Sequence, residues 1–565
     1  MKKFINNPRN VVREMLEGFV SLNPDQALLS DADIIIRADL PEPPQRRVAV
    51  LSGGGSGHEP AHSGYVGEGM LTGAIAGEVF TSPSVDAVLT AIRATAGPNG
   101  AVLIVKNYTG DRLNFGLAAE LATAEGIPTE VVVVADDAAL RETVEPERRR
   151  GIAGTVLVHK IAGAAVAAGA NLQEVAAEAR AAAASLRTMG VAIGSCTVPA
   201  VGSPSFSLGD KEMELGLGIH GEQGVRKANI VHADMIVDTI LDTLITDKGN
   251  AAGDRVALLV NGLGGTPPME LAIVARRAMQ RLREESLIVE RAWCGTFMTS
   301  LEMPGVSLTL LSLDDARIAR LDAEAHAPAW PGIGLIAEPR QVEVKIAQAE
   351  VAEHTAPGPL SSVLQKMALT VAQTLEEQEG TLTDLDMQTG DGDLGVSMAR
   401  GAAAIRSLPD SVWANPAVAF TAIGNAIRRA VAGSSGPLYA VGLLRIARAL
   451  NFPGAEVDKF VWAHAFSEGV TAISTLGGAK PGDRTMLDAL YPAAEAFCAA
   501  IDTGQTLSAA WERAVEAADR GAAATASMKP KLGRAAYLGD RAIGFEDAGA
   551  RAVVIWMKAL CDNAR

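Results

Sequence analysis

Short apolar runs recur through the first 330 residues, and each ends in a polar or glycine-rich turn. Runs of this length that are rich in valine, leucine and isoleucine are typical of buried strands. Such strands are predicted at residues 47–51, 101–105, 130–135, 255–260 and 307–311. An alanine-rich stretch, 163–186, has the composition of a helix, and helices that alternate with strands indicate a parallel sheet. The pattern predicts an α/β domain over 1–330, in two lobes of about 1–186 and 187–330.

The pattern changes after residue 330. The stretch 331–360 is polar, contains several prolines and has weak periodicity, so it is predicted to be a linker. Beyond it the strand signals stop and apolar positions recur at helical spacing. Helices are predicted at residues 364–378, 396–407, 417–431, 438–450, 460–475, 484–501, 507–524 and 548–560. The second part, 361–565, is thus predicted to be an all-α domain.

Composition narrows the class of protein. A chain of 565 residues suggests two to four domains, and 48% hydrophobic with 21% charged residues is ordinary for a globular protein. The net charge of −16 argues against a nucleic acid or an anionic membrane as partner. The four cysteines lie far apart without a CxxC pair, which excludes a zinc ribbon and makes a disulfide framework unexpected. No signal peptide and no apolar run of membrane-spanning length is present, so we expect a cytoplasmic protein.

The most informative stretch is 384–395, DLDMQTGDGDLG, where Asp386, Asp391 and Asp393 are expected in one short loop. Converging carboxylates repel one another unless a cation lies between them, and hard oxygen ligands suit Mg²⁺ or Ca²⁺. The helix predicted from residue 396 would direct its N-terminus to the same point, where phosphate binds well. This combination predicts a site for nucleotide phosphates. An Asp-Gly surface turn is the alternative, and an EF-hand is excluded because no glutamate follows at the required spacing.

Candidate site residues in the first half follow predicted strands, where ligands of parallel sheets bind. His58 lies in a glycine-rich turn, SGGGSGHEP, whose spacing fits neither a dinucleotide nor a P-loop fingerprint. His62, four residues on, could share a helical face with His58, but a zinc site has no evident third ligand. Lys106 and Asp111 follow the next strand and could equally form a solvated loop pair. His220 stands between glycines, although a lone histidine is usually structural.

Three loops of the second half are glycine-rich: 433–437, 477–485 and 533–539. Each could be an ordinary helix cap. Their occurrence beside an acidic loop in one all-α domain suggests a shared ligand.

These motifs resemble a known family. With GGGSGHEPAH, KNYTGD and GIHGE, the first half resembles the substrate subunit of dihydroxyacetone kinases. With DMQTGDGDLG, GSSGPL, GGAKPGDRTMLDAL and GRAAYLGDRAIG, the second half resembles their nucleotide-binding subunit. The fusion on one chain resembles the ATP-dependent members, rather than those that take phosphate from a phosphotransferase protein. The resemblance implies that the second domain is an eight-helix barrel that binds the nucleotide at one end.

The resemblance also assigns roles in the first domain. His220 matches the covalent anchor, whose imidazole adds to the substrate ketone and forms a hemiaminal. His58 matches the second active-site histidine, which assists that addition, and Asp111 matches the general base for the terminal hydroxyl. Gly55 and Lys106 match positions that hold the substrate.

In the second domain, the resemblance makes Asp386, Asp391 and Asp393 the ligands of paired Mg²⁺ ions on ATP. The implied nucleotide-binding residues are Leu394, Gly395, Ser397, Ser434, Ser435, Gly478, Met486, Arg534, Asp547 and Gly549. One departure is Ala548, where the family usually has proline, so the backbone of that loop is less fixed by its sequence.

The function implied is ATP-dependent phosphorylation of dihydroxyacetone, a small ketose. Erythrulose kinase is a close alternative, because one extra hydroxymethyl group is discriminated by only about 1–3 kcal/mol. Cyclisation of FAD by the nucleotide domain and ketose sensing without turnover are further alternatives, although a sensor needs neither metal ligands nor a base. The resemblance also implies a homodimer in which each active site combines domains from both chains.

Overall fold

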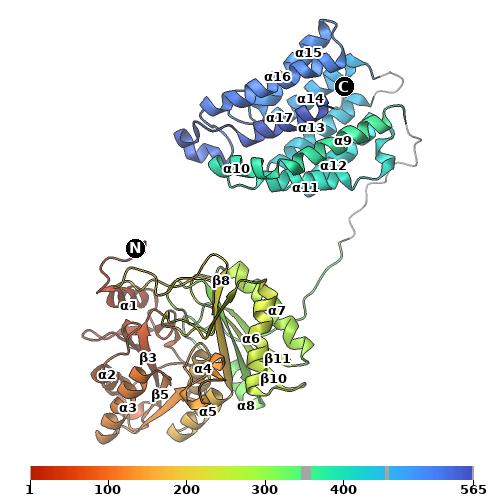
Figure 1. The fold of residues 1–565 in the computed structure, drawn as a ribbon. Helices are drawn as coiled ribbons and strands as arrows, with labels where there is room; N and C mark the ends of the chain where they lie inside the picture. Colours follow the sequence, from red (N-terminus) through yellow and green to blue (C-terminus); the bar gives the residue numbers. More distant parts are fainter. Residues whose placement is uncertain (1, 345–357, 452–456, 563–565) are drawn as a thin grey trace. The chain divides into compact units, whose positions relative to one another are not determined.

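The computed structural model describes residues 2–344, 358–451 and 457–562 and divides into two compact units, Met1–Val342 and Glu343–Arg565 (Figure 1). The first contains two β-sheets with covering helices, and the second is built from helices. An α/β domain followed by an all-α domain is the predicted fold class, which is confirmed.

The first sheet has the strand order β1-β2-β4-β3-β5-β6, in which β4, β3, β5 and β6 are parallel and β1 and β2 are antiparallel additions. Its strands are β1 (Gln26–Leu28), β2 (Ile34–Arg37), β3 (Ala49–Ser56), β4 (Gly73–Val79), β5 (Ala101–Lys106) and β6 (Thr129–Val134). Alternate residues of a strand face opposite sides. Leu51 accordingly packs with helices α2 (Val85–Thr95) and α3 (Thr109–Ala124), whereas Val50 packs with helices on the other face. The latter are α1 (Val11–Leu22), α4 (Thr155–Ala167) and α5 (Leu172–Ala184).

The second sheet has the order β11-β10-β12-β7-β8-β9, and only β10 and β11 pair in parallel. Its strands are β7 (Leu186–Ala192), β8 (Glu212–Leu215), β9 (Arg226–Asn229), β10 (Arg255–Gly262), β11 (Ile288–Gly295) and β12 (Gly305–Ser312). Helices α6 (Ala233–Lys248) and α7 (Pro268–Glu284) pack against it, and α8 (Asp315–Asp322) follows β12. The predicted parallel sheet thus corresponds to the first sheet, whereas the second is mostly antiparallel.

The structure adds two local details to the prediction. The stretch 163–186 forms parts of two helices, because Gly169 adopts a left-handed φ of 87° after α4 and Asn171 begins α5 with a capping box. Strand β4, with the sequence GAIAGEV, was not predicted because glycine and alanine mask its apolar pattern. The small residues of β4 let other parts of the chain approach closely. If Gly77 carried a Cβ atom, that atom would lie 2.1 Å from the carbonyl oxygen of Thr81.

Eight helices of the second unit close a barrel, each packing on the next and the last on the first (Figure 1). They are α9 (Ser361–Glu377), α11 (Leu394–Arg406), α12 (Pro416–Ala430), α13 (Ser435–Leu450), α14 (Lys459–Gly477), α15 (Leu487–Asp502), α16 (Leu507–Ala524) and α17 (Ala548–Asp562). A shorter helix, α10 (Glu379–Thr389), lies between α9 and α11 in the chain and was not predicted. The barrel encloses an apolar cavity of about 420 Å³. None of the helices among the described residues combines the length and apolarity needed to span a bilayer.

Candidate active site

Four predicted site residues of the first unit come from four separate segments. His58 follows β3, Lys106 is the last residue of β5, Asp111 lies in the first turn of α3, and His220 lies in the loop between β8 and β9. His58, Lys106 and Asp111 are buried, and His220 is partly exposed. The carboxyl ends of parallel strands share one edge of the sheet, so β3 and β5 deliver their residues to the same place.

The two candidate histidines face each other. Their ring centroids are 4.9 Å apart and the rings are inclined at 65°. His58 Nδ1 lies 2.8 Å from the carbonyl oxygen of Thr299. A carbonyl only accepts hydrogen bonds, so Nδ1 carries the proton and Nε2 has a lone pair. Nε2 is buried and has no hydrogen-bond partner among the residues that the structure describes, and burial holds the pKa of His58 well below its usual value.

Two aromatic rings complete the surroundings of His220. Tyr108 lies edge-on with its ring centroid 4.3 Å from that of His220, and Phe80 lies 5.4 Å away. Phe80 also stacks on His58 at 5.3 Å and has a left-handed φ of 58°, which is rare for an aromatic residue. Neither residue was predicted. Tyr108 could have been found because it lies inside KNYTGD, whereas Phe80 follows the unpredicted strand β4.

The electrostatic surroundings keep His220 neutral. Burial lowers its pKa to about 4, against the opposing effect of Glu222. Glu222 accepts the backbone N–H of His220 and pairs with Arg150 at 3.2 Å. Arg150 in turn donates to Asp137 at 2.7 Å and to the carbonyl oxygen of Gly216 at 2.8 Å. The loop is thus held by a chain of charges while the imidazole remains uncharged near pH 7.

Lys106 and Asp111 approach each other beside the glycine-rich end of β3. Lys106 Nζ donates to the carbonyl oxygen of Gly53 at 3.1 Å. A Cβ at Gly54 would lie 2.5 Å from this ammonium and 3.4 Å from Asp111 Oδ2, so glycine leaves that space open. Asp111 Oδ1 is buried, and no hydrogen-bond partner for it occurs in the described part of the chain. A Cβ at Gly55 would instead lie 2.5 Å from the backbone nitrogen of Thr81, which gives Gly55 a packing role.

His58 and His62 do not share a helical face. Strand β3 ends at Ser56, and a short 3₁₀ helix, Ser63–Tyr65, begins only after His62. The His62 ring is turned toward Lys106, with Nε2 at 2.7 Å from Nζ. The geometry of these two histidines therefore gives no support to a zinc site, as expected from the lack of a third ligand in the sequence.

The second unit brings Asp386, Asp391 and Asp393 together, with one oxygen of each within 4.8 Å of the others. Asp386 lies on the last turn of α10, so its predicted place in a loop is wrong. Its Oδ2 accepts the backbone N–H of Asp393 at 3.0 Å. The Arg534 guanidinium pairs with Asp391 and lies 3.8 Å from Asp393. Three neighbouring carboxylates fit a site for a hard divalent cation, and the Arg534 guanidinium balances part of their charge.

The predicted nucleotide residues lie at helix ends. Consecutive barrel helices joined by short loops run antiparallel, so the N-termini of α11, α13, α15 and α17 gather at one end. Helix α11 begins with Leu394, Gly395 and Ser397, and α13 begins at Ser434 and Ser435. Helix α14 ends just before Gly478, and α15 follows Met486. A 3₁₀ helix begins at Arg534, and the start of α17 lies between Asp547 and Gly549. The contacts of the described residues join Gly549 to Met486 and Arg534 to the acidic cluster. They do not join Ser434, Ser435 or Gly478 to that cluster.

Hydrogen bonds fix the loop that lacks the family's proline. Asp547 Oδ1 accepts the backbone N–H of Ala550 at 2.8 Å, and the Asp547 N–H donates to Thr525 Oγ1 at 2.8 Å. Burial raises the pKa of Asp547 to about 6. The buried guanidinium of Arg484, which was not predicted, donates to three carbonyl oxygens of the same region, those of Thr525, Ala542 and Phe545.

Comparison with known proteins adds to these observations. Residues 17–329 match the Dak1 domain, and residues 388–562 match the DAK2 domain. The chain is 36% identical over 572 residues to the dihydroxyacetone kinase of Citrobacter freundii, with 99% of each chain covered. The crystal structure of that kinase in complex with AMP-PNP and Mg²⁺ has a TM-score of 0.66 to this chain, at 35% identity and 99% coverage of each chain. The chain belongs to the dihydroxyacetone kinase family.

Other relatives of the chain are named for other substrates or reactions. The triokinase/FMN cyclase of Homo sapiens is 42% identical to this chain over 582 residues, with 99% of each chain covered. The D-erythrulose kinase of Mycolicibacterium smegmatis is 34% identical over 577 residues, which cover 100% of this chain and 98% of the relative. Kinases thus recur among the relatives, while the named substrates vary.

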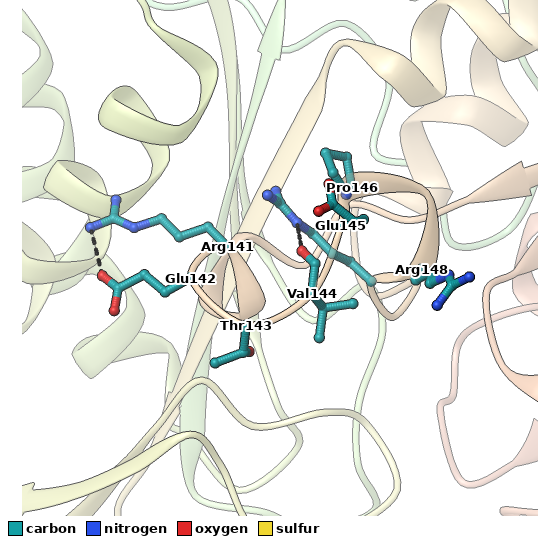
Figure 2. Close-up of a pocket in the computed structure, with 8 residues that line it drawn as sticks. Arg141, Glu142, Thr143, Val144, Glu145, Pro146 and Arg148 are labelled. Carbon is teal, nitrogen blue, oxygen red and sulfur yellow. Dashed lines mark hydrogen bonds and ion pairs between the residues drawn. The ribbon is translucent and has the colours of Figure 1, made fainter.

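A further pocket, of about 440 Å³, lies between β6 and α4 in the chain and contains none of the predicted site residues (Figure 2). It is lined by Arg141, Glu142, Thr143, Val144, Glu145, Pro146, Arg148 and Arg149. Its buried arginine, Arg149, pairs with Asp247 at 2.6 Å, and Arg141 pairs with Glu142 at 3.8 Å. Because these charges are already paired, the pocket offers a weaker candidate site than the histidine cluster.

Proposed function

We propose that this chain is an ATP-dependent kinase that phosphorylates the terminal hydroxyl of dihydroxyacetone while the ketose is bound covalently to His220. The observation that carries the proposal is the pair of facing imidazoles, one neutral and partly exposed, the other buried with an unpartnered Nε2. A neutral imidazole has the lone pair that addition to a ketone requires. Family membership supports the kinase reaction.

Addition of His220 to the ketone forms one N–C bond and converts the C=O double bond to C–OH. One proton moves from the imidazole to the former carbonyl oxygen, so the product is a neutral hemiaminal. His58 Nε2 supports this transfer, because it is an unprotonated acceptor in a buried place close to His220. Glycerol has no carbonyl and is therefore excluded from this capture.

Asp111 is proposed as the general base for the terminal hydroxyl. Its Oδ1 is buried and free of hydrogen bonds among the described residues, as an acceptor awaiting a substrate proton should be. Lys106 lies next to it and can donate to a ketose oxygen. Removal of the hydroxyl proton as phosphoryl transfer proceeds leaves that proton on Asp111.

In the second unit, Asp386, Asp391 and Asp393 would hold Mg²⁺, because one oxygen of each lies close enough to the others to bind a single cation. Bound Mg²⁺, proposed as two ions, would neutralise the charge of the ATP phosphates. Arg534, which already pairs with the acidic cluster, and the helix N-termini of α11 and α13 supply further positive potential for phosphate oxygens.

Two relatives support alternative functions for the chain. The D-erythrulose kinase relative favours a four-carbon ketose with the same ketone and terminal hydroxymethyl group. The triokinase/FMN cyclase relative favours an additional cyclising activity of the nucleotide domain. The erythrulose kinase would use the same residues and differ only in its substrate, whereas the cyclising reaction would need only the residues of the nucleotide domain. We also propose a cytoplasmic, domain-exchanged homodimer, as the family resemblance implies.

The proposal is tested by ADP release with ATP and Mg²⁺ on dihydroxyacetone, both erythrulose enantiomers, glyceraldehyde and glycerol. The highest kcat/KM is expected for dihydroxyacetone, with no turnover of glycerol. Preference for an erythrulose would move the assignment to the erythrulose kinase alternative. Absence of turnover on every ketose would contradict the kinase proposal, and ketose binding without turnover would favour a sensor.

A further inference from the structure

A buried chain of hydrogen bonds runs from Lys106 back into the first sheet. Lys106 Nζ lies 2.7 Å from His62 Nε2, and His62 Nδ1 lies 3.3 Å from Ser52 Oγ. Ser52 Oγ donates to the carbonyl oxygen of Ile104 at 2.7 Å, on the strand beside it. Ser52, His62 and Lys106 are all buried. The chain therefore connects the ammonium to the sheet backbone without exposure to water.

The direction of each hydrogen bond follows from the number of protons. Ser52 has one hydroxyl proton, which goes to Ile104 because a carbonyl oxygen only accepts. Ser52 Oγ can then only accept from His62, so Nδ1 of His62 is protonated. Burial and the charge of Lys106 hold the pKa of His62 well below its usual value, so the ring is neutral and Nε2 is unprotonated. Nε2 is thus the acceptor for Lys106.

We propose that His62, with its tautomer set by Ser52, is a positioning residue that holds the Lys106 ammonium in place for the ketose. The inference rests on the proposed function of Lys106. Among the described residues, the ammonium donates to the Gly53 carbonyl oxygen and to His62 Nε2, which leaves one of its three N–H groups for a substrate oxygen.

The position of Asp111 shows why this acceptor matters. Lys106 Nζ and Asp111 Oδ2 both border the space that a side chain at Gly54 would fill. A buried ammonium that loses an acceptor must find another, because an unpaired buried donor is costly. The nearest anionic acceptor is the carboxylate of Asp111. An ion pair there would occupy the proposed general base, so His62 keeps Lys106 and Asp111 available for separate tasks.

His159 provides a matched control. Its ring on α4 packs edge-on against His62, with centroids 5.2 Å apart, and it is equally buried. Both of its ring nitrogens lack hydrogen-bond partners among the described residues. Replacement of His159 by leucine removes a buried imidazole from the same cluster but no hydrogen bond to Lys106.

The test compares His62→Leu, His62→Gln and His159→Leu in the full chain. For His62→Leu, kcat/KM for the ketose is expected to fall roughly 10- to 100-fold, the effect of one hydrogen bond to a charged group, while KM for ATP is unchanged. Glutamine offers an acceptor at a similar reach, so His62→Gln should recover most of the loss. His159→Leu should lower thermal stability as His62→Leu does, but leave kcat/KM near that of the wild type.

Two results would overturn the inference: equal losses of kcat/KM in His62→Leu and His159→Leu, or no recovery in His62→Gln. A separate measurement does not depend on turnover or on the folding of a variant with leucine. The ¹⁵N spectrum of the histidine-labelled wild type, assigned with His62→Gln, should show His62 protonated at Nδ1 alone. Protonation at Nε2 would contradict the inference, whereas absent turnover with the Nδ1 tautomer present would refute only the proposed function.

Discussion

His58 and His220 face each other with their ring centroids 4.9 Å apart, although 161 positions of the chain separate them. The loop between β11 and β12 of the second sheet supplies the Thr299 carbonyl that fixes the His58 tautomer, and His58 itself follows the end of β3 in the first sheet. The unpartnered Nε2 of His58 therefore depends on contacts between the two lobes of the first unit.

The acceptor role of His58 Nε2 predicts that His58→Gln impairs capture of the ketose less than His58→Phe. Both variants keep a large side chain, but only glutamine keeps a polar atom near Nε2. We expect kcat/KM for dihydroxyacetone to fall roughly 10²-fold or more in His58→Phe, as for loss of a general acid–base group. Equal kinetics of His58→Phe and the wild type would show that His58 only fills space.

The pKa of His220 predicts the pH dependence of ketose capture. Because its pKa in the folded protein is about 4, below the usual 6.5, the ring stays neutral as the pH falls through 6.5 and gains its proton only near 4. Hemiaminal formation should therefore persist from about pH 8 to pH 5 and decline toward pH 4. Equilibrium binding of the ketose without ATP measures this profile. A midpoint near 6.5 would contradict the assigned environment.

Glu222 offers a control for that profile. Its negative charge raises the pKa of His220, against the larger effect of burial. Glu222→Gln removes the charge and keeps an acceptor for the backbone N–H of His220, so the midpoint of the binding profile should move to lower pH. A shift to higher pH would mean that Glu222 does not act on His220 through its charge.

Burial of neutral His220 also predicts the sign of a stability change. The unfolded chain takes up a proton near pH 6.5, whereas the folded ring does not until about pH 4. The folded state therefore loses stability as the pH falls from about 6.5 to 4. Chemical unfolding of wild type and His220→Gln should show that the wild type loses more stability over this interval. Identical slopes would contradict the predicted linkage.

The acidic cluster predicts a metal-dependent effect on ATP. Asp391→Ala should lower kcat roughly 10²-fold or more and weaken Mg²⁺-dependent ATP binding, because one of three converging carboxylates is lost. Asp384→Ala is the control, since Asp384 is an exposed carboxylate on α10, the helix that also carries Asp386, and lies outside the cluster. Calorimetric titration of ATP with and without Mg²⁺ measures the effect. Equal affinities in the two variants would remove the metal role from Asp391.

The proposed domain exchange predicts complementation between two inactive variants. His220→Ala disables the first domain and Asp391→Ala the second. In a domain-exchanged dimer, a mixed pair contains one site with both intact domains, so random exchange of equal amounts should recover roughly a quarter of wild-type activity. Recovery is measured by ADP release after the variants are mixed. A dimer that remains inactive after verified exchange would contradict domain exchange.

Much of the fold could be predicted from the pattern of apolar and polar residues, and the elements that could not be predicted have physical reasons. Strands such as β5 and β12 were predicted because their sequences are apolar runs typical of buried strands. Strand β4 was not, since its small residues carry no such pattern. A loop was predicted where the end of helix α10 lies, because the sequence there is only weakly amphipathic and contains Asp384 and Asp386.

The residues of the candidate site likewise divide into those that the sequence predicts and those that it does not. Histidine, lysine and aspartate in glycine-rich motifs were found in the sequence, because these residues are uncommon beside buried strands. Phe80 and Thr299 were not, since one acts through its ring and the other through its backbone carbonyl. Such contacts arise only when distant segments meet, and no local signal marks them.

The most direct test of the account is ¹³C NMR of dihydroxyacetone labelled at the ketone carbon and bound to the full chain without ATP. The account predicts that the bound signal moves from the ketone region to that of a tetrahedral carbon, and that His220→Ala abolishes the shifted signal. A bound ketone that keeps its carbonyl signal in the wild type, or a tetrahedral signal that survives in His220→Ala, would contradict covalent capture on His220.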